Sequence, residues 1–428
     1  MQAMTLTSAA ERRRLESLDR PALEAHQLAR FNALLAQILP ANRFYATQLA
    51  GLKPPLRSLA ELEALPYTSK EQLLGTPDDA GLAANRTYPP EHYVRFHQTS
   101  GTRGRPLAVL DTAEDWKWWI DCWQHVFDAA GVTSDDAVLM AFSFGPFVGF
   151  WSAYDAAAAR GCLVVPGGGL SSLARLELMR TSRATVICCT PSYALHLAEV
   201  GAGRQIDVSK LGVRVLIVSG EPGGSIAATR SRISAAWNAR VLDHGGATEV
   251  GPWGFGDAAE LGLHVNESQF IAEFRAIDTG RSAREGELAE LVLTTLGRSG
   301  SPVIRYRTGD LVRPVWKHGQ ACQFVLLEGG VLGRCDDMLT VRGVNVFPSA
   351  IEQIVRGFPE VVEYRLSLSK TQEMDQLLLE IEDHLNQPDR VAEELRIRLG
   401  LKVEVRAVPP NTLPRFEGKG RRVIVQRS

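Results

Sequence analysis

The stretch from His97 to Pro106 concentrates side chains suited to phosphate chemistry. It holds three hydroxyl residues, two glycines and two arginines, in the order Thr99, Ser100, Gly101, Thr102, Arg103, Gly104, Arg105. Glycine lets the backbone approach a ligand and adopt positive φ, and successive N–H groups can form an anion-binding nest. The glycines lack the spacing of a Walker A loop. The stretch alone predicts either a polyphosphate-binding loop or a polar hairpin turn.

Further motifs follow in a fixed order along the chain. They are Ala247-Thr248-Glu249, Arg305-Tyr306-Arg307-Thr308-Gly309-Asp310-Leu311, Gly333-Arg334-Cys335-Asp336-Asp337-Met338, and Lys419 within Pro414-Arg415-Phe416-Glu417-Gly418-Lys419. Together with the first stretch, they resemble the signatures of the adenylate-forming superfamily, which includes acyl-CoA synthetases, adenylation domains and luciferases. The resemblance spans Pro21 to Lys419 and is closest to the phenylacetate–CoA ligase family.

The resemblance implies how ATP is bound. The β- and γ-phosphates would be held by Thr99, Ser100, Gly101, Thr102 and Gly104, with Arg105 at a position that usually holds lysine. Arginine keeps the charge but presents a planar fork instead of a point charge.

Thr248 and Glu249 resemble the pair that binds the α-phosphate and Mg²⁺, and both are expected to be catalytic. A hard cation prefers carboxylate oxygen, which Glu249 supplies. Asp310 resembles the aspartate that accepts hydrogen bonds from the ribose hydroxyls, and Arg334 the arginine that reaches the nucleotide. Taken singly, Thr-Glu is also typical of a helix N-cap and its first-turn acid. Asp310 is also compatible with a turn.

The family's C-terminal domain rotates between two half-reactions, and the resemblance implies the same here. We expect a core at residues 1–335, a lid at 336–428 and a hinge at Asp336, where polar loop residues could absorb a φ/ψ change. Lys419 would reach the α-phosphate and the substrate carboxylate in the first half-reaction. The loop near Gly343 would line the thiol's tunnel in the second. The alternative for Lys419 is an exposed lysine in a basic tail.

One position departs from the family pattern. Gly245 stands where an aromatic residue usually stacks on adenine, a contact worth roughly 1–3 kcal/mol by analogy with base stacking. His244 could substitute, although its side chain should point elsewhere. The base could otherwise be held by Gly220, Glu221 and Pro222. Some relatives carry a cysteine zinc site before a Gly-Leu-His segment, but residues 257–262 contain no cysteine, so no zinc is predicted.

The acid pocket is expected to be lined by Phe144, Phe147, Phe150 and Trp151, with Gly246 and Ala247 leaving room. An aromatic, apolar wall suits a flat aromatic or arylacetic acid. Core packing is the alternative interpretation of these aromatic residues.

The predicted function is therefore an AMP-forming ligase that converts a carboxylic acid and Mg-ATP to an acyl-adenylate and passes the acyl group to coenzyme A. A second hypothesis keeps adenylation but changes the acceptor to an amine, a carrier protein or a phenolic cofactor. A third is a non-catalytic relative that only binds adenylate. Arg105 and Gly245 motivate the third, whereas Glu249, Asp310 and Lys419 argue against it.

Composition narrows the class of protein. The 428 residues exceed one ordinary core, so two or more domains are expected. A net charge of −2 gives no reason to expect nucleic acid or an anionic membrane as a partner. Six cysteines without CxxC spacing, and a charged N-terminal region without a signal-peptide pattern, favour a cytoplasmic protein. The oligomeric state stays open, a homodimer included.

The elements that must position these residues follow an alternating pattern. Between residues 138 and 243, Val/Ile/Leu-rich strands alternate with helices, which predicts an α/β fold with mostly parallel strands covered by helices. Ligands bind such sheets beyond the carboxyl ends of the strands, where loops are expected at 143–150, 166–172, 220–224 and 244–251. Strands at 270–277, 287–294, 303–306 and 323–327 suggest a smaller sheet or barrel, followed by a small α+β domain. The aromatic helix around Trp116, Trp119 and Trp123 is expected to pack in the core.

Overall fold

Five parallel strands form one half of the large sheet in this computed structural model, which describes residues 6–75, 81–99, 105–149, 151–257, 259, 262–317, 321–337, 339–341, 344–371, 374–399, 403–415 and 422–425. The strands are β3 (Ala137–Met140), β4 (Leu163–Pro166), β5 (Val186–Cys189), β6 (Val215–Val218) and β7 (Arg240–Ala247). The connecting helices are α6 (Trp151–Arg160), α7 (Ser172–Ser182), α8 (Pro191–Gly203), η4 (Val208–Lys210) and α9 (Ala227–Trp237).

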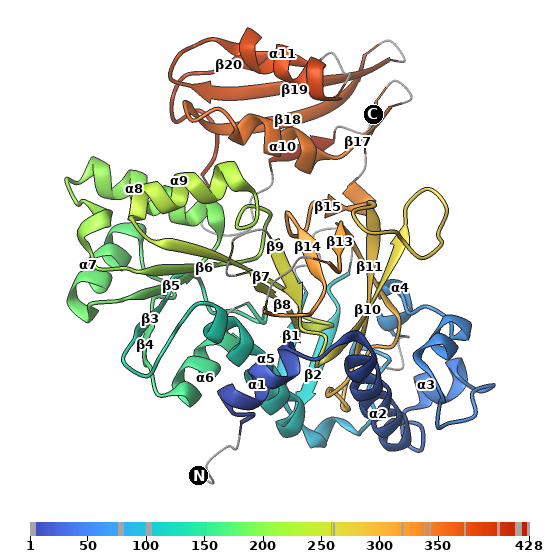
Figure 1. Cartoon of the computed structure of the whole chain (residues 1–428). Helices are drawn as coiled ribbons and strands as arrows, with labels where there is room; N and C mark the ends of the chain where they lie inside the picture. Colours follow the sequence, from blue (N-terminus) through green and yellow to red (C-terminus); the bar gives the residue numbers. More distant parts are fainter. Residues whose placement is uncertain are drawn as a thin grey trace.

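Side-chain alternation along the strands explains why helices cover both faces of this sheet. In β5, Val186 and Cys188 pack into the core that contains α5 and α6, whereas Ile187 and Cys189 pack into the core of α7, α8 and α9. All four are fully buried. Successive strand residues point to opposite faces, so a strand apolar on both sides needs cover on both. The predicted parallel, doubly covered sheet is confirmed (Figure 1).

Antiparallel strands extend the sheet beyond β7. The nine strands run in the order β13-β14-β9-β8-β7-β6-β5-β3-β4, where β8 is Gly251–Gly256, β9 is Gly262–Val265, β13 is Pro314–Val315 and β14 is Leu326–Glu328. The strand expected at 323–327 thus pairs with β9 in the large sheet, so its assignment to the smaller sheet was wrong. The backbone N–H of Val265, at the end of β9, donates a hydrogen bond to the Val325 carbonyl oxygen and so holds this segment beside β9.

The smaller sheet has four antiparallel strands. They are β10 (Phe270–Ala276), β11 (Ala289–Thr295), β12 (Tyr306–Val312) and β15 (Gly333–Arg334). The strand predicted at 303–306 instead begins at Tyr306, because Arg305 has a positive φ of 49° that interrupts extended backbone. The residues of the Arg-Tyr-Arg-Thr-Gly-Asp motif from Tyr306 onward therefore lie on a strand.

The helix α5 (Ala113–Ala129) follows the hairpin of β1 (Tyr93–Gln98) and β2 (Ala108–Thr112). Thr112 caps it by accepting a hydrogen bond from the Asp115 N–H. Trp116, Trp119 and Trp123 are each at most 6% exposed. The core-packing interpretation of these tryptophans is confirmed.

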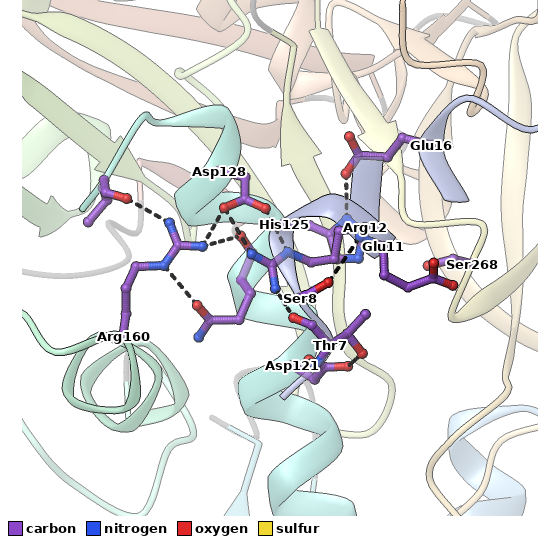
Figure 2. A network of polar contacts seen from close by, with 12 residues as sticks. Thr7, Ser8, Glu11, Arg12, Glu16, Asp121, His125, Asp128, Arg160 and Ser268 are labelled. Atoms are coloured by element: carbon purple, nitrogen blue, oxygen red, sulfur yellow. Dashed lines mark hydrogen bonds and ion pairs between the residues drawn. The ribbon is translucent and has the colours of Figure 1, made fainter. Parts of the chain in front are cut away.

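The N-terminal segments wrap around this core. They comprise α1 (Ala9–Glu16), α2 (Arg20–Ile38), α3 (Arg43–Gln48), η1 (Leu59–Ala64), α4 (Lys70–Leu73) and η3 (Pro90–His92). Figure 2 shows how α1 attaches to α5: Arg12 lies 2.6 Å from Asp128, and His125 Nδ1 lies 2.6 Å from Glu16. Arg160 of α6 also pairs with Asp128, so three helices share this polar network.

The last part of the chain has its own sheet and core. After η5 (Cys335–Asp337), its elements are β16 (Leu339–Val341), β17 (Val344–Val346), α10 (Pro348–Arg356), β18 (Val361–Thr371), β19 (Met374–Asp383), α11 (Pro388–Leu399), β20 (Glu404–Ala407) and β21 (Val423–Val425). The sheet order is β20-β19-β18-β21. Figure 1 shows this part seated over α8, α9 and β15. Within the described residues, no helix combines the length and apolar character needed to cross a membrane.

His264 and Asp257 form a buried polar pair where β8, β9 and β14 meet. His264 is 2% exposed; its Nε2 lies 3.2 Å from Asp257 Oδ1 and its Nδ1 lies 3.1 Å from the Phe324 carbonyl oxygen. Burial alone would lower the pKa of His264, but the hydrogen bond with Asp257 and the proximity of Cys322 outweigh it and raise the pKa to about 10.

Replacing Asp257 by Asn should lower the free energy of unfolding by about 3 kcal/mol at neutral pH, because a buried imidazolium would lose its counter-charge. A histidine whose pKa is raised by folding stabilises the fold fully below its unfolded pKa of about 6.5. That stabilisation is lost as the pH rises through about 10. Denaturant unfolding across this range should show the wild-type advantage shrinking with pH. A constant difference would contradict the charged pair.

Candidate active site

The Thr248–Glu249 turn lies at the centre of the candidate site. Residues 244–247 were expected to be loop, but β7 runs on to Ala247 and pairs with β8 antiparallel, leaving only a tight turn at 248–250. The loop prediction for 244–251 is corrected accordingly. The strand continues because Gly245 pairs with Gly254, and Ala247 with Gly251, of β8. The Thr-Glu pair is thus at a hairpin turn and does not cap a helix.

Two buried side chains hold this turn. The Tyr306 hydroxyl donates a hydrogen bond to Glu249 Oε1 at 2.7 Å, and Arg298 Nη1 donates to the Thr248 carbonyl oxygen at 3.2 Å. Tyr306 is 3% exposed, and burial together with the charge of Glu249 raises its pKa well above the ordinary value. Tyr306 therefore remains a hydrogen-bond donor and fixes one carboxylate oxygen of Glu249.

Arg298 is anchored in turn by a fully buried ion pair. Its Nη2 lies 2.7 Å from Asp111 Oδ1, and neither side chain is more than 1% exposed. Trp119 Nε1 also donates to Asp111 Oδ1 at 3.1 Å, and the Arg298 guanidinium lies 5.2 Å from the Trp119 ring centroid. Asp111 is on β2, so this pair connects the hairpin of the predicted phosphate loop to the Thr248–Glu249 turn.

Asp310 and Arg334 meet across two strands. They are partners in the β12–β15 register, and Arg334 Nη1 lies 2.9 Å from Asp310 Oδ1. Arg334 Nε also lies 3.0 Å from Asp336, the predicted hinge residue. Gly309 has φ +74°, and a Cβ there would come within 2.8 Å of Arg334 Nη2, so glycine is required for this approach. The structure thus brings together the predicted ribose-binding, nucleotide-binding and hinge residues.

The Pro66–Thr68 segment supports the same strand. Thr68 N donates to the Arg305 carbonyl oxygen at 3.0 Å, and Arg307 N donates to the Thr68 carbonyl oxygen at 3.0 Å. Tyr67 lies under the Arg305 guanidinium, 4.3 Å from the ring centroid. This segment therefore acts as a short extra strand that fixes the start of β12.

The predicted phosphate loop is described only at its two ends. Thr99 Oγ1 accepts a hydrogen bond from Leu107 N at 3.0 Å, and Thr99 N donates to the Leu107 carbonyl oxygen at 3.0 Å, which closes the base of the loop. Arg105 is exposed and donates to the Leu74 carbonyl oxygen. The intervening residues predicted to bind phosphate lie outside the described residues: Ser100, Gly101, Thr102 and Gly104.

The residues considered for adenine take different positions. Gly220, with φ +93°, and Pro222 lie in the turn after β6, and Glu221 Oε1 in that turn accepts from Ser192 N at 2.8 Å. His244 points into the core, where its ring centroid is 4.2 Å from that of Trp123 and its Nδ1 is 2.7 Å from the Gly254 carbonyl oxygen. Burial lowers the His244 pKa to about 4.

The space beside position 245, where the family pattern has an aromatic residue, is occupied by the side chain of another residue. A Cβ on Gly245 would lie 2.7 Å from the ring of Trp253, which is itself 1% exposed. Trp253 therefore occupies the space that a side chain at 245 would need. Gly246 is exposed and Ala247 partly exposed, as expected for positions that leave room in a site.

Phe144 and Trp151 lie together in an aromatic cluster. Their ring centroids are 4.5 Å apart, and Phe142 and Tyr154 lie 4.8 Å and 5.9 Å from Phe144. Phe147 is instead 47% exposed, and Phe150 lies outside the described residues. Trp151 and Gly145 also line a cavity of about 220 Å³ with Trp116 and residues 94–97 of β1.

Lys419 and Gly343 lie outside the described residues as well. Within the described ranges, no group of three or more His, Cys, Asp or Glu residues is arranged to hold a metal ion. The absence of zinc stays a prediction.

Sequence reasoning missed the residues that support the site. Asp111, Arg298 and Trp253 belong to none of the motifs, and Tyr306 lies within a motif but has no predicted role of its own. The one available signal was Arg298 itself, an arginine in a glycine- and serine-rich segment between two strands. Its partner Asp111, nearly 190 residues earlier, carries no local sign of the pairing.

Comparisons with known proteins identify the family of the chain. The family model described as AMP-binding enzyme matches residues 43–271, and that described as AMP-binding enzyme C-terminal domain matches residues 343–427. The chain belongs to the AMP-binding enzyme family.

The individual relatives define its branch. A phenylacetate-coenzyme A ligase from Thermus thermophilus is 31% identical, over 96% of this chain and 98% of its own. A solved 2-hydroxyisobutyryl-CoA ligase in the postadenylation state with a bound acyl-AMP is 26% identical, with a TM-score of 0.92 over 100% of this chain and 95% of that chain. In its thioesterification state, with CoA, the same ligase is 27% identical over the same shares, with a TM-score of 0.74. The chain is an AMP-forming acid–coenzyme A ligase, with ATP, a carboxylic acid and coenzyme A as substrates.

Replacing Tyr306 by Phe removes the hydrogen bond that orients Glu249. A hydrogen bond to a charged group is worth roughly 1.5–3 kcal/mol, so acid-dependent pyrophosphate release should slow by about tenfold. The measurement is single-turnover pyrophosphate release at saturating ATP. The matched control is Tyr193→Phe, which removes another buried hydroxyl, one bonded to Ser172 and Arg175. Equal loss of activity in both variants would show that Tyr306 acts only through stability.

Proposed function

We propose that this ligase activates an aromatic or arylacetic acid and that the predicted site residues perform both half-reactions. The observation that supports this most is the junction at Tyr306, whose hydroxyl holds Glu249 and whose strand β12 continues to Asp310, which pairs with Arg334 on the neighbouring strand β15. The predicted α-phosphate and ribose contacts are thereby set at a fixed separation. We place the division between core and lid at residues 335 and 336, with Asp336 as the hinge.

In the first half-reaction, one oxygen of the substrate carboxylate attacks the α-phosphorus of ATP, and pyrophosphate leaves. Thr248 contacts the α-phosphate, Asp310 accepts hydrogen bonds from the ribose hydroxyls, and Arg334 keeps Asp310 oriented. Glu249 fits a hard divalent cation, because it supplies carboxylate oxygen at a partly exposed turn and Tyr306 fixes its direction. Mg²⁺ bound there would neutralise charge that develops on the phosphates.

We assign Lys419 as the cation that assists the attack of the substrate carboxylate on the α-phosphate. Two anions, the carboxylate and the α-phosphate, must approach each other, and a placed ammonium lowers that cost. In the second half-reaction the thiolate of coenzyme A attacks the acyl carbonyl and AMP leaves. We assign the loop at Gly343 to the thiol's path, as the family resemblance implies.

The adenine contact is the part of the site that differs from the family pattern. Since His244 packs against Trp123 and Trp253 fills the space beside Gly245, neither is placed as an exposed stacking partner. We assign adenine to the turn of Gly220, Glu221 and Pro222 and to the exposed backbone of Gly246.

Two observations bear on the acid. The cluster of Phe142, Phe144, Trp151 and Tyr154 offers aromatic surface at the carboxyl end of β3, where acid is expected to bind. The Thermus thermophilus relative is a ligase of an arylacetic acid. The second candidate is a short hydroxy acid, because the solved structure that matches over the whole chain is a 2-hydroxyisobutyryl-CoA ligase.

A panel of acids should separate these candidates. We expect an arylacetic or aryl acid to give the highest kcat/KM for pyrophosphate release with Mg-ATP, and thioester to form once coenzyme A is added. Preference for 2-hydroxyisobutyrate would favour the second candidate. Pyrophosphate release without thioester for every acid would contradict coenzyme A as the acceptor.

Replacing Lys419 by Ala should reduce adenylate formation by at least a hundredfold and leave thioester formation from supplied acyl-adenylate near wild type, because the two half-reactions use different lid surfaces. Each half-reaction is followed separately in rapid-quench assays. The control is Lys210→Ala, a lysine with an 82% exposed side chain on η4. If both half-reactions of Lys419→Ala matched wild type, its assignment would be wrong.

A further inference from the structure

Two arginines flank the segment that contains Lys419, one on each side. Arg415 precedes it and Arg422 follows it. Each arginine forms a close ion pair with a carboxylate of the C-terminal sheet. Arg415 Nη2 lies 2.7 Å from Glu382 Oε2, and Arg422 Nε lies 2.7 Å from Glu363 Oε1. Both carboxylates are at most 4% exposed, so the arginines are fixed to the C-terminal part and must move with it.

Each arginine also faces a carboxylate of the large N-terminal part. Arg422 Nη1 lies 3.5 Å from Glu221 Oε2, and both side chains are 8% exposed. Arg415 Nε lies 3.7 Å from Glu199 Oε2, in a more exposed position. These contacts are longer than those within the C-terminal sheet. They are therefore the contacts that would break first if the two parts separated.

The two N-terminal carboxylates are held by one helix. Glu199 is on α8, and Glu221 accepts a hydrogen bond from Ser192 N in the first turn of α8. Figure 1 shows the C-terminal sheet above α8 and α9. A third contact, from Arg232 of α9 to the Val361 carbonyl oxygen at 3.3 Å, lies on the same side.

The arrangement of the two parts matches one state of a solved relative better than another. The TM-score is 0.92 with the postadenylation state of 2-hydroxyisobutyryl-CoA ligase and 0.74 with its thioesterification state, at nearly equal sequence identity. The cross-contacts of Arg415 and Arg422 thus belong to the arrangement seen with a newly formed adenylate.

We propose that the Glu221–Arg422 and Glu199–Arg415 pairs are positioning contacts that hold the C-terminal part against α8 and the turn at residues 220–222 during adenylate formation, and that both pairs break before the thioester is made. Glu221 lies in the turn assigned to adenine, so its pair with Arg422 ties the nucleotide site directly to the lid. The inference rests on the proposed role of Lys419.

Neutralising the N-terminal partners tests the proposal without disturbing the C-terminal sheet. The variants are Glu199→Gln, Glu221→Gln and the double variant. Glutamine keeps the volume, and at 221 its carbonyl oxygen can still accept from Ser192 N. The double variant should form adenylate about tenfold more slowly. Glu199→Gln alone, which lies on α8 outside the adenine turn, should convert supplied acyl-adenylate to thioester at the wild-type rate or faster. The matched control is Glu177→Gln, on the exposed face of α7.

Glu221→Gln alone should have the larger effect, because its pair is the more buried one. A slowing of both half-reactions by the same factor would overturn the proposal. So would a defect in Glu221→Gln confined to the KM for ATP, with Glu199→Gln unchanged.

Hydrogen–deuterium exchange gives a readout that needs no substrate. In the unliganded double variant, exchange should increase in α8 and at residues 361–366, and remain at the wild-type level in Glu177→Gln. Unchanged exchange would contradict the contacts. If the wild-type protein activates no acid, the proposed function is wrong, but the exchange measurement still tests whether the two ion pairs form. If wild type is active and the variants shift neither measurement, only the present inference fails.

Discussion

The buried ion pair between Asp111 and Arg298 is the interaction on which the site depends. Its members are 1% and 0% exposed, and together they join the β1–β2 hairpin, the aromatic helix α5 and the Thr248–Glu249 turn. Removing a charge from water is costly, so such a pair persists only where further hydrogen bonds satisfy both groups. Trp119 donates one to Asp111, and the Thr248 carbonyl oxygen accepts one from Arg298 Nη1. The β1–β2 hairpin and the Thr248–Glu249 turn, which were predicted to bind phosphate, are thus connected through this ion pair.

A second set of contacts links the candidate site to the C-terminal part. Tyr306 connects Glu249 to β12, β12 holds Asp310, and Arg334 bridges Asp310 to Asp336 immediately before the C-terminal part. On the other side of the nucleotide turn, Glu221 contacts Arg422 of that part. Among the described residues, the predicted nucleotide contacts are therefore connected to the C-terminal part both along the chain, through Arg334 and Asp336, and through space, through Glu221 and Arg422.

The sequence predicted the architecture well where one physical signal dominates. Strands such as Val186–Cys189, apolar at every position, and helices such as Trp151–Arg160 between them require a parallel sheet covered on both faces. The prediction failed where tertiary pairing decides conformation. Residues 244–247, with two glycines, are typical of a loop, yet β8 pairs with them and makes them strand. Arg305 interrupts a strand through its positive φ, a conformation that glycine or asparagine would have suggested but that arginine gives no reason to expect.

The site was predictable as far as its motifs extend. Thr248, Glu249, Asp310 and Arg334 could be proposed as site residues because each belongs to a recognisable local pattern, and the structure places Arg334 Nη1 2.9 Å from Asp310 Oδ1. Asp111, Arg298 and Trp253 could not be found that way, since their roles depend on partners distant in the sequence. Trp253 also gives a physical reason for Gly245: a Cβ there would lie 2.7 Å from the indole ring.

The central claim is that the acid is activated by direct attack of its carboxylate on the α-phosphorus. Transfer of oxygen-18 tests this most directly. The ligase is incubated with a carboxylic acid labelled on both carboxylate oxygens, with Mg-ATP and with coenzyme A. The mass of the AMP product is then measured by mass spectrometry. Adenylation followed by thiolysis leaves one labelled oxygen on AMP. AMP without label, alongside labelled thioester, would contradict the acyl-adenylate and with it the roles given to Thr248, Glu249 and Lys419.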